Sequence, residues 1–267
     1  MAVEIGSLEI RCLAFTQRRA KRTLITGDLV TGLGLTDDQE RKVLSRLAKK
    51  GMIARVRRGL YITPTRLTGG GRWSPGEAVA LDTLMRDRDG RYQISGPNAF
   101  YRYGWTEQIP NRIYAYNNRI SGERTIGVSE FTLIKVPDDR LGGVEILRDP
   151  DGIDVVYASK ARAIVDAVVD WTRFDGLPRA LTWIRQEIKK DDSFAVELVD
   201  VALQFGNQGS IRRIGYSLEI EDAPVRLVDR LEKEIQSSSS LIPWNPRNPK
   251  RGKIQKRWGI VDNVRES

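Results

Sequence analysis

The region that most constrains the fold lies between residues 36 and 64, where a capped amphipathic helix is followed at once by a short hairpin. Thr36 is a good N-cap, and Gln39 stands three residues later at the spacing of a capping box. Gly51 follows the last helical residue, where glycine commonly ends a helix. Gly59 allows a tight turn between two short runs of β-forming residues. These signals predict a helix that stops at Gly51 and hairpin strands at Met52–Val56 and Leu60–Thr63.

Two further helices are expected before this one. Apolar residues recur at close to helical spacing in Ser7–Arg19. A short helix is expected near Thr26–Thr31, with a glycine-containing turn at Gly32–Gly34 after it. The order helix, helix, turn, helix, hairpin is typical of a winged helix-turn-helix. The first 67 residues are therefore predicted to form such a module.

The chain after residue 67 has a different organisation. Three consecutive glycines and Pro75 indicate a linker near residues 67–75. Short strand candidates come first, and five successive helix candidates follow between Ala158 and Gln236. Strands first and helices afterwards favour an α+β domain over a doubly wound sheet. We therefore expect an α+β protein with two domains, residues 1–67 and residues 68–267.

The net charge of +9 is unevenly distributed along the chain. Residues 1–66 hold 14 basic and 6 acidic residues, whereas residues 67–236 hold 23 and 27. The last stretch, residues 237–267, holds 7 basic and 2 acidic residues. A basic first module, an acidic middle and a basic end indicate different partners for different parts of the chain.

Histidine is absent and Cys12 is the only cysteine. Catalysis by Ser-His-Asp or Cys-His groups, histidine-containing zinc sites and structural zinc fingers are therefore excluded. A single cysteine excludes an internal disulfide and suits a reducing cytosol. No apolar run approaches about 18 residues, and the start of the chain lacks the basic region of a signal peptide. We expect a cytoplasmic protein without a membrane span and without a cofactor.

The predicted third helix and the hairpin both carry basic side chains. A helix that recognises DNA needs donors on one face for phosphates and base edges, and an apolar face that fixes its angle. Arginine at a hairpin tip can enter the minor groove or contact phosphates. The predicted DNA-binding residues are Arg41, Lys42, Ser45, Arg46 and Lys49 on the helix and Arg55, Arg57 and Arg58 on the hairpin.

The segment Ser95–Pro110, SGPNAFYRYGWTEQIP, is the densest aromatic patch of the predicted second domain. Its rings could form a stacking platform for nucleic acid or a surface for a partner protein. Packing in the core is the interpretation that we favour. The ending after residue 237 has too many prolines for a helix, and could be a tail or an extended ribbon packed on the domain.

Several segments together resemble the AbiEi family, the antitoxins of type IV toxin–antitoxin (abortive infection) systems. The resemblance extends over essentially the whole chain, and none of its motifs is a short catalytic signature. The segments that carry it are RVRRGLYITP (55–64), SGPNAFYRYGWTEQIP (95–110), GERTIGVSEFTLIKV (122–136), VYASKARAIVDAVVDW (156–171) and KRWGIVDN (256–263).

The resemblance implies an N-terminal winged helix that binds double-stranded operator DNA, at inverted repeats in the protein's own promoter, and represses its own operon. It also implies a larger C-terminal domain that neutralises a nucleotidyltransferase-like toxin without requiring a stable complex with it. The KRWGIVDN ending is then expected to be folded. The residues carried over as DNA contacts are Arg41, Lys42, Ser45, Arg46, Lys49, Arg57 and Arg58.

Two other functions stay open on the residues alone, although we expect a protein that is not an enzyme. A ligand-responsive regulator would sense a metabolite with its larger domain, and altered operator affinity in the presence of a small molecule would favour it. A metal-dependent nuclease would need two or three acidic ligands and a lysine, and would cleave plasmid DNA with a divalent ion. Its candidate residues are Asp138, Asp139, Glu145, Asp154, Lys135 and Lys160.

Overall fold

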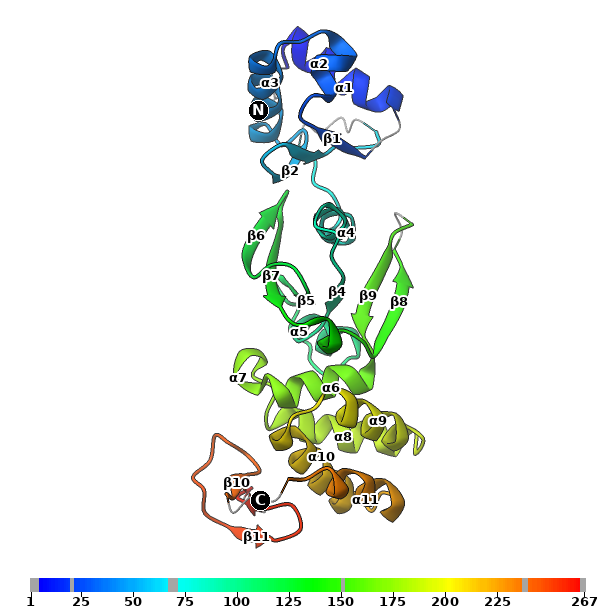
Figure 1. Ribbon diagram of the computed structural model, residues 1–267, viewed down its shortest axis with the longest axis vertical. Helices are drawn as coiled ribbons and strands as arrows, with labels where there is room; N and C mark the ends of the chain where they lie inside the picture. The colour runs from blue at the N-terminus through cyan, green and yellow to red at the C-terminus, as the bar shows by residue number, and fades with distance from the viewer. Residues whose placement is uncertain (1–4, 20–21, 67–71, 150–151, 237–239, 265–267) are drawn as a thin grey trace. The chain divides into compact units, whose positions relative to one another are not determined.

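The computed structural model describes residues 5–19, 22–66, 72–149, 152–236 and 240–264 (Figure 1). Helices and strands are mixed in an α+β fold, as the sequence predicted. The contacts divide the chain into two compact units. Unit 1 consists of Met1–Tyr92, Asn111–Val136 and Leu147–Val155, and unit 2 of Gln93–Pro110, Pro137–Ile146 and Val156–Ser267. Residues 67–71 of the predicted linker, and with them the predicted domain boundary, lie outside the described residues.

The described residues up to Arg66, called the N-terminal module below, combine helices with a small sheet (blue to cyan in Figure 1). The helices and the hairpin follow the predicted order. Strand β1 is an addition to that order, because it pairs antiparallel with β3 and extends the hairpin to a sheet of order β1-β3-β2. The elements are α1 (Ser7–Arg19), β1 (Thr23–Ile25), α2 (Asp28–Leu33), α3 (Asp37–Lys49), β2 (Ala54–Arg57) and β3 (Leu60–Ile62).

Helix α3 begins and ends at the predicted signals. The Thr36 hydroxyl accepts the Gln39 N–H at 3.2 Å, and the Gln39 side chain accepts the Thr36 N–H at 2.9 Å. At the other end Gly51 has a φ of +68°, and its N–H donates to the Ala48 carbonyl at 3.0 Å. Glycine adopts this left-handed backbone without the steric cost of a Cβ atom. The helix is therefore terminated by local sequence at both ends.

Glu40 joins α2 to α3. Its carboxylate is fully buried and accepts the backbone N–H groups of Gly27 at 2.7 Å and Leu29 at 2.8 Å. These groups lie at the start of α2, where N–H groups have no partner within the helix. A buried carboxylate from α3 thus caps α2 and fixes the angle between the two helices.

The core of the module is a single apolar cluster to which the helices and the sheet all contribute. Burial raises the pKa of Cys12, one of its members, to about 11. The buried members are Cys12, Leu13, Leu24, Leu29, Leu35, Val43, Leu44, Leu47, Met52, Ile53 and Tyr61.

The remainder of unit 1 contains α4 (Glu77–Asp87), β5 (Ile113–Asn117), β6 (Gly122–Ile126) and β7 (Ser129–Lys135). Strand β7 pairs parallel with β5 and antiparallel with β6, a strand that the sequence did not reveal. The N-cap position of α4 is occupied by Gly76. The nearby Ser74 hydroxyl accepts the Val128 N–H at 3.0 Å, in the turn between β6 and β7.

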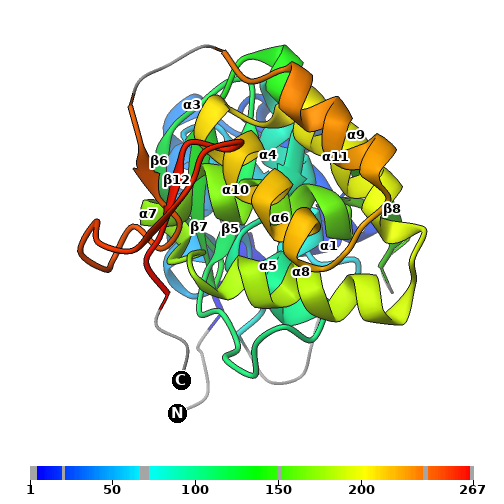
Figure 2. The same cartoon turned by 90° about the horizontal axis from the view of Figure 1, so that it is seen from below.

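Unit 2 contains the helical series. All five predicted helical segments are helical, and the first is divided between α6 and α7. Helices α9, α10 and α11 pack against one another (Figure 2). Besides a 3₁₀ helix (Asp138–Arg140) and three short strands at the end of the chain, the elements that belong to unit 2 in whole or in part are β4 (Tyr92–Ile94), α5 (Pro97–Arg102), β8 (Val144–Arg148), β9 (Asp154–Ala158), α6 (Lys160–Val169), α7 (Trp171–Phe174), α8 (Arg179–Lys190), α9 (Phe194–Phe205), α10 (Gln208–Ile220) and α11 (Val225–Lys233).

The aromatic segment Ser95–Pro110 contributes to the interior of unit 2, as predicted. Phe100 is buried, and Trp105 stacks on Trp183 of α8 with ring centroids 5.1 Å apart. The Trp105 indole donates to Glu187 at 3.0 Å, and this buried carboxylate also accepts hydrogen bonds from Lys160 and Lys190. Burial acts to raise the pKa of Glu187, but the three hydrogen bonds outweigh it and lower the pKa to about 2. Phe100 is therefore a core residue and Trp105 packs beside it, whereas Tyr101 of the same segment is 43% exposed.

The end of the chain is a folded ribbon, as the resemblance implied. Its strands β10 (Ile242–Pro243), β11 (Lys253–Gln255) and β12 (Ile260–Asp262) lie in the order β10-β12-β11. Between β11 and β12, the buried Trp258 donates to Glu219 of α10 at 2.7 Å. The neighbouring Arg257 forms ion pairs with Glu219, Asp229 and Glu232 of α10 and α11.

None of the helices in the described parts of the chain is long and apolar enough to cross a membrane.

Candidate nucleic-acid interface

Helix α3 presents a cationic face to solvent. The five residues predicted to contact DNA, Arg41, Lys42, Ser45, Arg46 and Lys49, are all exposed. The buried residues of the same helix are Glu40, Val43, Leu44 and Leu47. Residues three and four apart share one side of a helix, so the four cations lie on the side away from the core.

The first turn of α3 is acidic. Asp37 and Asp38 are exposed, and Arg41 forms an ion pair with Asp38 at 2.6 Å. The two side chains of this pair are 70% and 67% exposed, so the pair contributes little and is easily exchanged. Because carboxylates repel phosphates, the part of α3 that suits a polyanion is its second half.

The β2–β3 hairpin carries the other three predicted residues. Side chains along β2 alternate between buried and exposed, and Arg55 and Arg57 are both exposed. Arg58 is exposed at the tip, where Gly59 has a φ of +81°. The Gly59 carbonyl accepts the Thr26 N–H at 3.0 Å, which fixes the tip to the segment after β1.

Arg57 differs from the other two hairpin arginines because it is held by a carboxylate, that of Asp87. Its Nε lies 2.7 Å from Oδ2 of Asp87 and its Nη2 lies 2.6 Å from Oδ1. This bidentate pair raises the pKa of Arg57 and, through the same hydrogen bonds, lowers the pKa of Asp87. Asp87 is the last residue of α4, so the pair connects the hairpin to α4 within unit 1.

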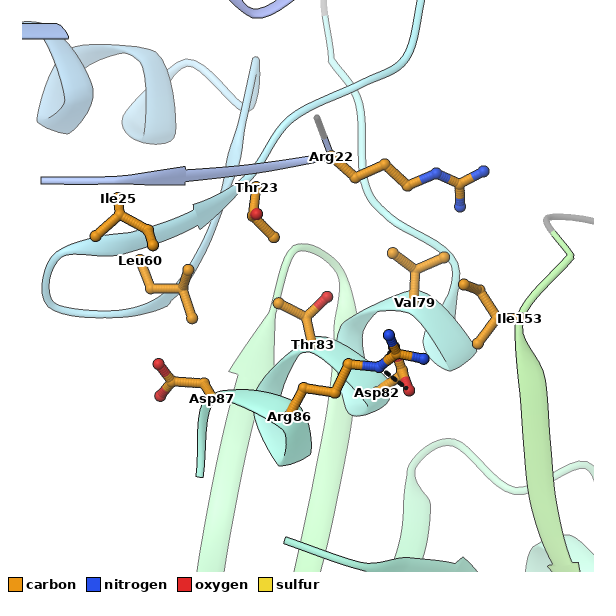
Figure 3. A pocket seen from close by; sticks show the side chains of 10 residues that line it. All are labelled: Arg22, Thr23, Ile25, Leu60, Val79, Asp82, Thr83, Arg86, Asp87 and Ile153. Carbon is orange, nitrogen blue, oxygen red and sulfur yellow. Dashed lines mark hydrogen bonds and ion pairs between the residues drawn. The ribbon is translucent and has the colours of Figure 1, made fainter. Parts of the chain in front are cut away.

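A cavity of about 420 Å³ lies between the sheet of the N-terminal module and α4 (Figure 3). Ile25, Leu60 and Val79 give it an apolar lining. Its charged groups balance one another, because two arginines and two aspartates line it and Arg86 pairs with Asp82 at 2.8 Å. The cavity therefore has no net preference for an anion or a cation.

Two of the carboxylates considered as metal ligands of a nuclease, Glu145 and Asp154, form separate ion pairs with arginines. Within the residues that the structure describes, no three Asp, Glu or Cys side chains gather where they could hold a metal ion. The ion pairs are Asp154 with Arg148, Glu145 with Arg102, and Lys160 with Glu187.

Comparison with known proteins supports the architecture and no more. The fold belongs to the α+β class. No protein-family model matches the chain, and no curated protein matches it either. The chain is similar in structure to the RV2827C protein from Mycobacterium tuberculosis, with a TM-score of 0.63 and 14% sequence identity. The match covers 98% of this chain and 94% of that one. At this identity the likeness concerns the fold alone.

The roles of two residues that hold this part of the molecule in place were not predicted from the sequence. Asp87 is one residue of an amphipathic helix in the sequence, and nothing local marks it as the partner of an arginine 30 positions earlier. Glu40 occupies an ordinary polar position next to the buried stripe of α3. Its proximity to Val43 and Leu44, three and four residues on, is the one signal that could have indicated an inward side chain.

Proposed function

We propose that the protein is a DNA-binding regulator whose N-terminal module is a winged helix-turn-helix. In this proposal, α3 is the recognition helix and the β2–β3 hairpin is the wing. We further propose that the protein is the antitoxin and autorepressor of a type IV toxin–antitoxin operon, which rests on the resemblance to the AbiEi family.

The observation that carries the DNA-binding proposal is the concentration of exposed cations on two adjacent elements. The second half of α3 has basic side chains and no exposed carboxylate, and the hairpin adds Arg55 and Arg58. Within the residues that the structure describes, neither of these two arginines forms an ion pair with a carboxylate, in contrast to Arg57. Such a surface suits the phosphates of a duplex, with Ser45 and Arg46 placed to reach base edges.

The salt dependence of binding tests this surface. Arg41, Lys42, Arg46, Lys49, Arg55 and Arg58 could each neutralise one phosphate. If four to six of them do so, the logarithm of the binding constant should fall with the logarithm of salt concentration with a slope of about −4 to −5. The measurement is fluorescence anisotropy with a duplex from the protein's own promoter. A slope near zero would mean that another surface binds.

Substitutions distinguish residues that contact the DNA backbone from residues that recognise the base sequence. Arg55→Ala with Arg58→Ala should weaken binding to every duplex and make the salt slope shallower by about 2. Arg46→Ala should weaken binding and also reduce the difference between operator and unrelated DNA. Lys189→Ala, on the exposed side of α8, is the matched control and should leave binding unchanged.

The antitoxin role needs a separate readout. Co-expression of the chain with the nucleotidyltransferase-like toxin of its operon should restore growth of the host cell. Because neutralisation is assigned to the larger domain, Lys42→Ala with Arg46→Ala should abolish promoter repression and keep the protection. Loss of both activities in a variant that stays folded would contradict this division of labour.

A further inference from the structure

A second cavity, of about 610 Å³, lies beside the proposed recognition helix and wing. Three parts of unit 1 line it: the end of α3 with the chain into β2, the segment Arg72–Ser74, and the turn between β6 and β7. Its volume falls within the range of about 300–1,000 Å³ that is usual for small-molecule sites.

The charge of this cavity is unbalanced, unlike that of the cavity in Figure 3. Lys49, Arg55 and Arg72 line it, and its lining contains no carboxylate. In the described portion of the chain, no ion pair is formed by any of these three side chains, all of which are exposed. Three uncompensated cations around one hollow repel each other, and an anion bound among them would relieve this repulsion.

The cavity also has an aromatic wall that is anchored to the protein. Trp73 is partly buried and lines the cavity. Its backbone N–H donates to the Gly51 carbonyl at 2.7 Å, immediately after α3. The face of an indole stacks favourably on a planar ring such as a nucleobase.

The opposite wall is held in place by Ser74 and the turn between β6 and β7. The Ser74 hydroxyl accepts the Val128 N–H at 3.0 Å. Gly127 has a φ of +64°, and a Cβ atom there would lie 2.1 Å from the Ser74 hydroxyl oxygen. Only glycine therefore allows this turn to approach so closely, and the wall is a built feature of unit 1.

We propose that this cavity binds a nucleoside phosphate, with the phosphates on Lys49, Arg55 and Arg72 and the base against Trp73. The proposal deepens the proposed function and rests on it for its consequence. Lys49 and Arg55 belong to the predicted DNA surface, so a bound nucleotide occupies two of its cations. Nucleotide and operator DNA then compete, and the nucleotide acts as a negative effector of repression.

The test is isothermal titration calorimetry of the full chain with ATP and with GTP at low ionic strength. Inorganic phosphate is the comparison ligand. We expect at least one nucleotide to bind at least tenfold more tightly than phosphate. Arg72→Ala should weaken nucleotide binding about tenfold, and Trp73→Phe should weaken it less than Trp73→Ala. Addition of nucleotide should raise the apparent Kd for the promoter duplex.

Arg72 is outside the predicted DNA surface, so its replacement distinguishes the two proposals. Arg72→Ala should leave DNA binding unchanged, whereas Lys42→Ala should weaken DNA binding and leave nucleotide binding unchanged. Equal binding of phosphate and nucleotides, or no binding of either, would overturn the nucleotide site. A loss of DNA affinity in Arg72→Ala would also overturn it, because the cavity would then hold a phosphate of the DNA backbone.

Discussion

The ion pair between Arg57 and Asp87 leads to a prediction in which the removal of an acidic residue strengthens DNA binding. A DNA phosphate that binds Arg57 must first displace the Asp87 carboxylate. This carboxylate holds the guanidinium through two hydrogen bonds of 2.7 and 2.6 Å. The Asp87 side chain is 14% exposed and the Arg57 side chain 43%, so solvent screens the pair substantially. We therefore take about 1 kcal/mol, the upper end for exposed pairs, as its contribution.

Asp87→Asn removes this competition. The Kd for the promoter duplex should fall by up to about fivefold, which is the equivalent of about 1 kcal/mol. Because Arg57 becomes available to one more phosphate, the salt slope should become steeper by about 0.9. Fluorescence anisotropy at salt concentrations of roughly 50 to 200 mM measures both quantities.

The matched control is Asp82→Asn, which removes a carboxylate from the same helix but releases Arg86 instead of the wing arginine. It should change the slope less than Asp87→Asn does. In an Arg57→Ala background, Asp87→Asn should have no effect. If Asp87→Asn weakens DNA binding as much as Arg57→Ala, Asp87 positions the arginine for DNA and the competition argument is wrong.

Three further predictions concern stability and reactivity. Glu40→Ala should lower the free energy of unfolding by about 2–3 kcal/mol in urea titrations, because two N–H groups at the start of α2 lose a charged acceptor, and Glu40→Gln should cost less. The depressed pKa of Glu187 gives stability that is fully present above its ordinary value of 4.5 and is lost as the pH falls towards 2, so thermal unfolding of Glu187→Gln should depend less on pH in that window. Cys12 is buried and its pKa is raised to about 11, so thiol reagents at pH 8 should label it only after denaturation, and rapid labelling of the folded chain would contradict this packing.

Features that are determined by signals within one helix or strand could be predicted from the sequence. The capping box at Thr36 and the glycine at position 51 each act over three or four residues, and both ends of α3 are where they indicate. The helices of unit 2 have long apolar patterns, so their existence was also predictable. The same holds for the outward position of the eight basic and polar candidate residues, because each lies off an apolar stripe.

Features that depend on distant parts of the chain could not be predicted. Strand β1 has three residues and is a strand only because β3 pairs with it. In β6, four of the five residues are exposed, so it lacks the alternation that marks a half-buried strand. The ion pair of Arg57 with Asp87 and the second cavity each require a fold that brings together residues 30 or more positions apart.

The last ribbon has a practical consequence for any experiment that shortens the protein. Arg257 forms ion pairs with three carboxylates on α10 and α11, and Trp258 donates a hydrogen bond to one of them. A chain that ends before these two residues would leave the three negative charges without this arginine. Residues 240–264 therefore stabilise the helices of unit 2 and are part of the folded unit. Assays on truncated forms should keep this segment, or misfolding of the helical series will be mistaken for loss of the proposed function.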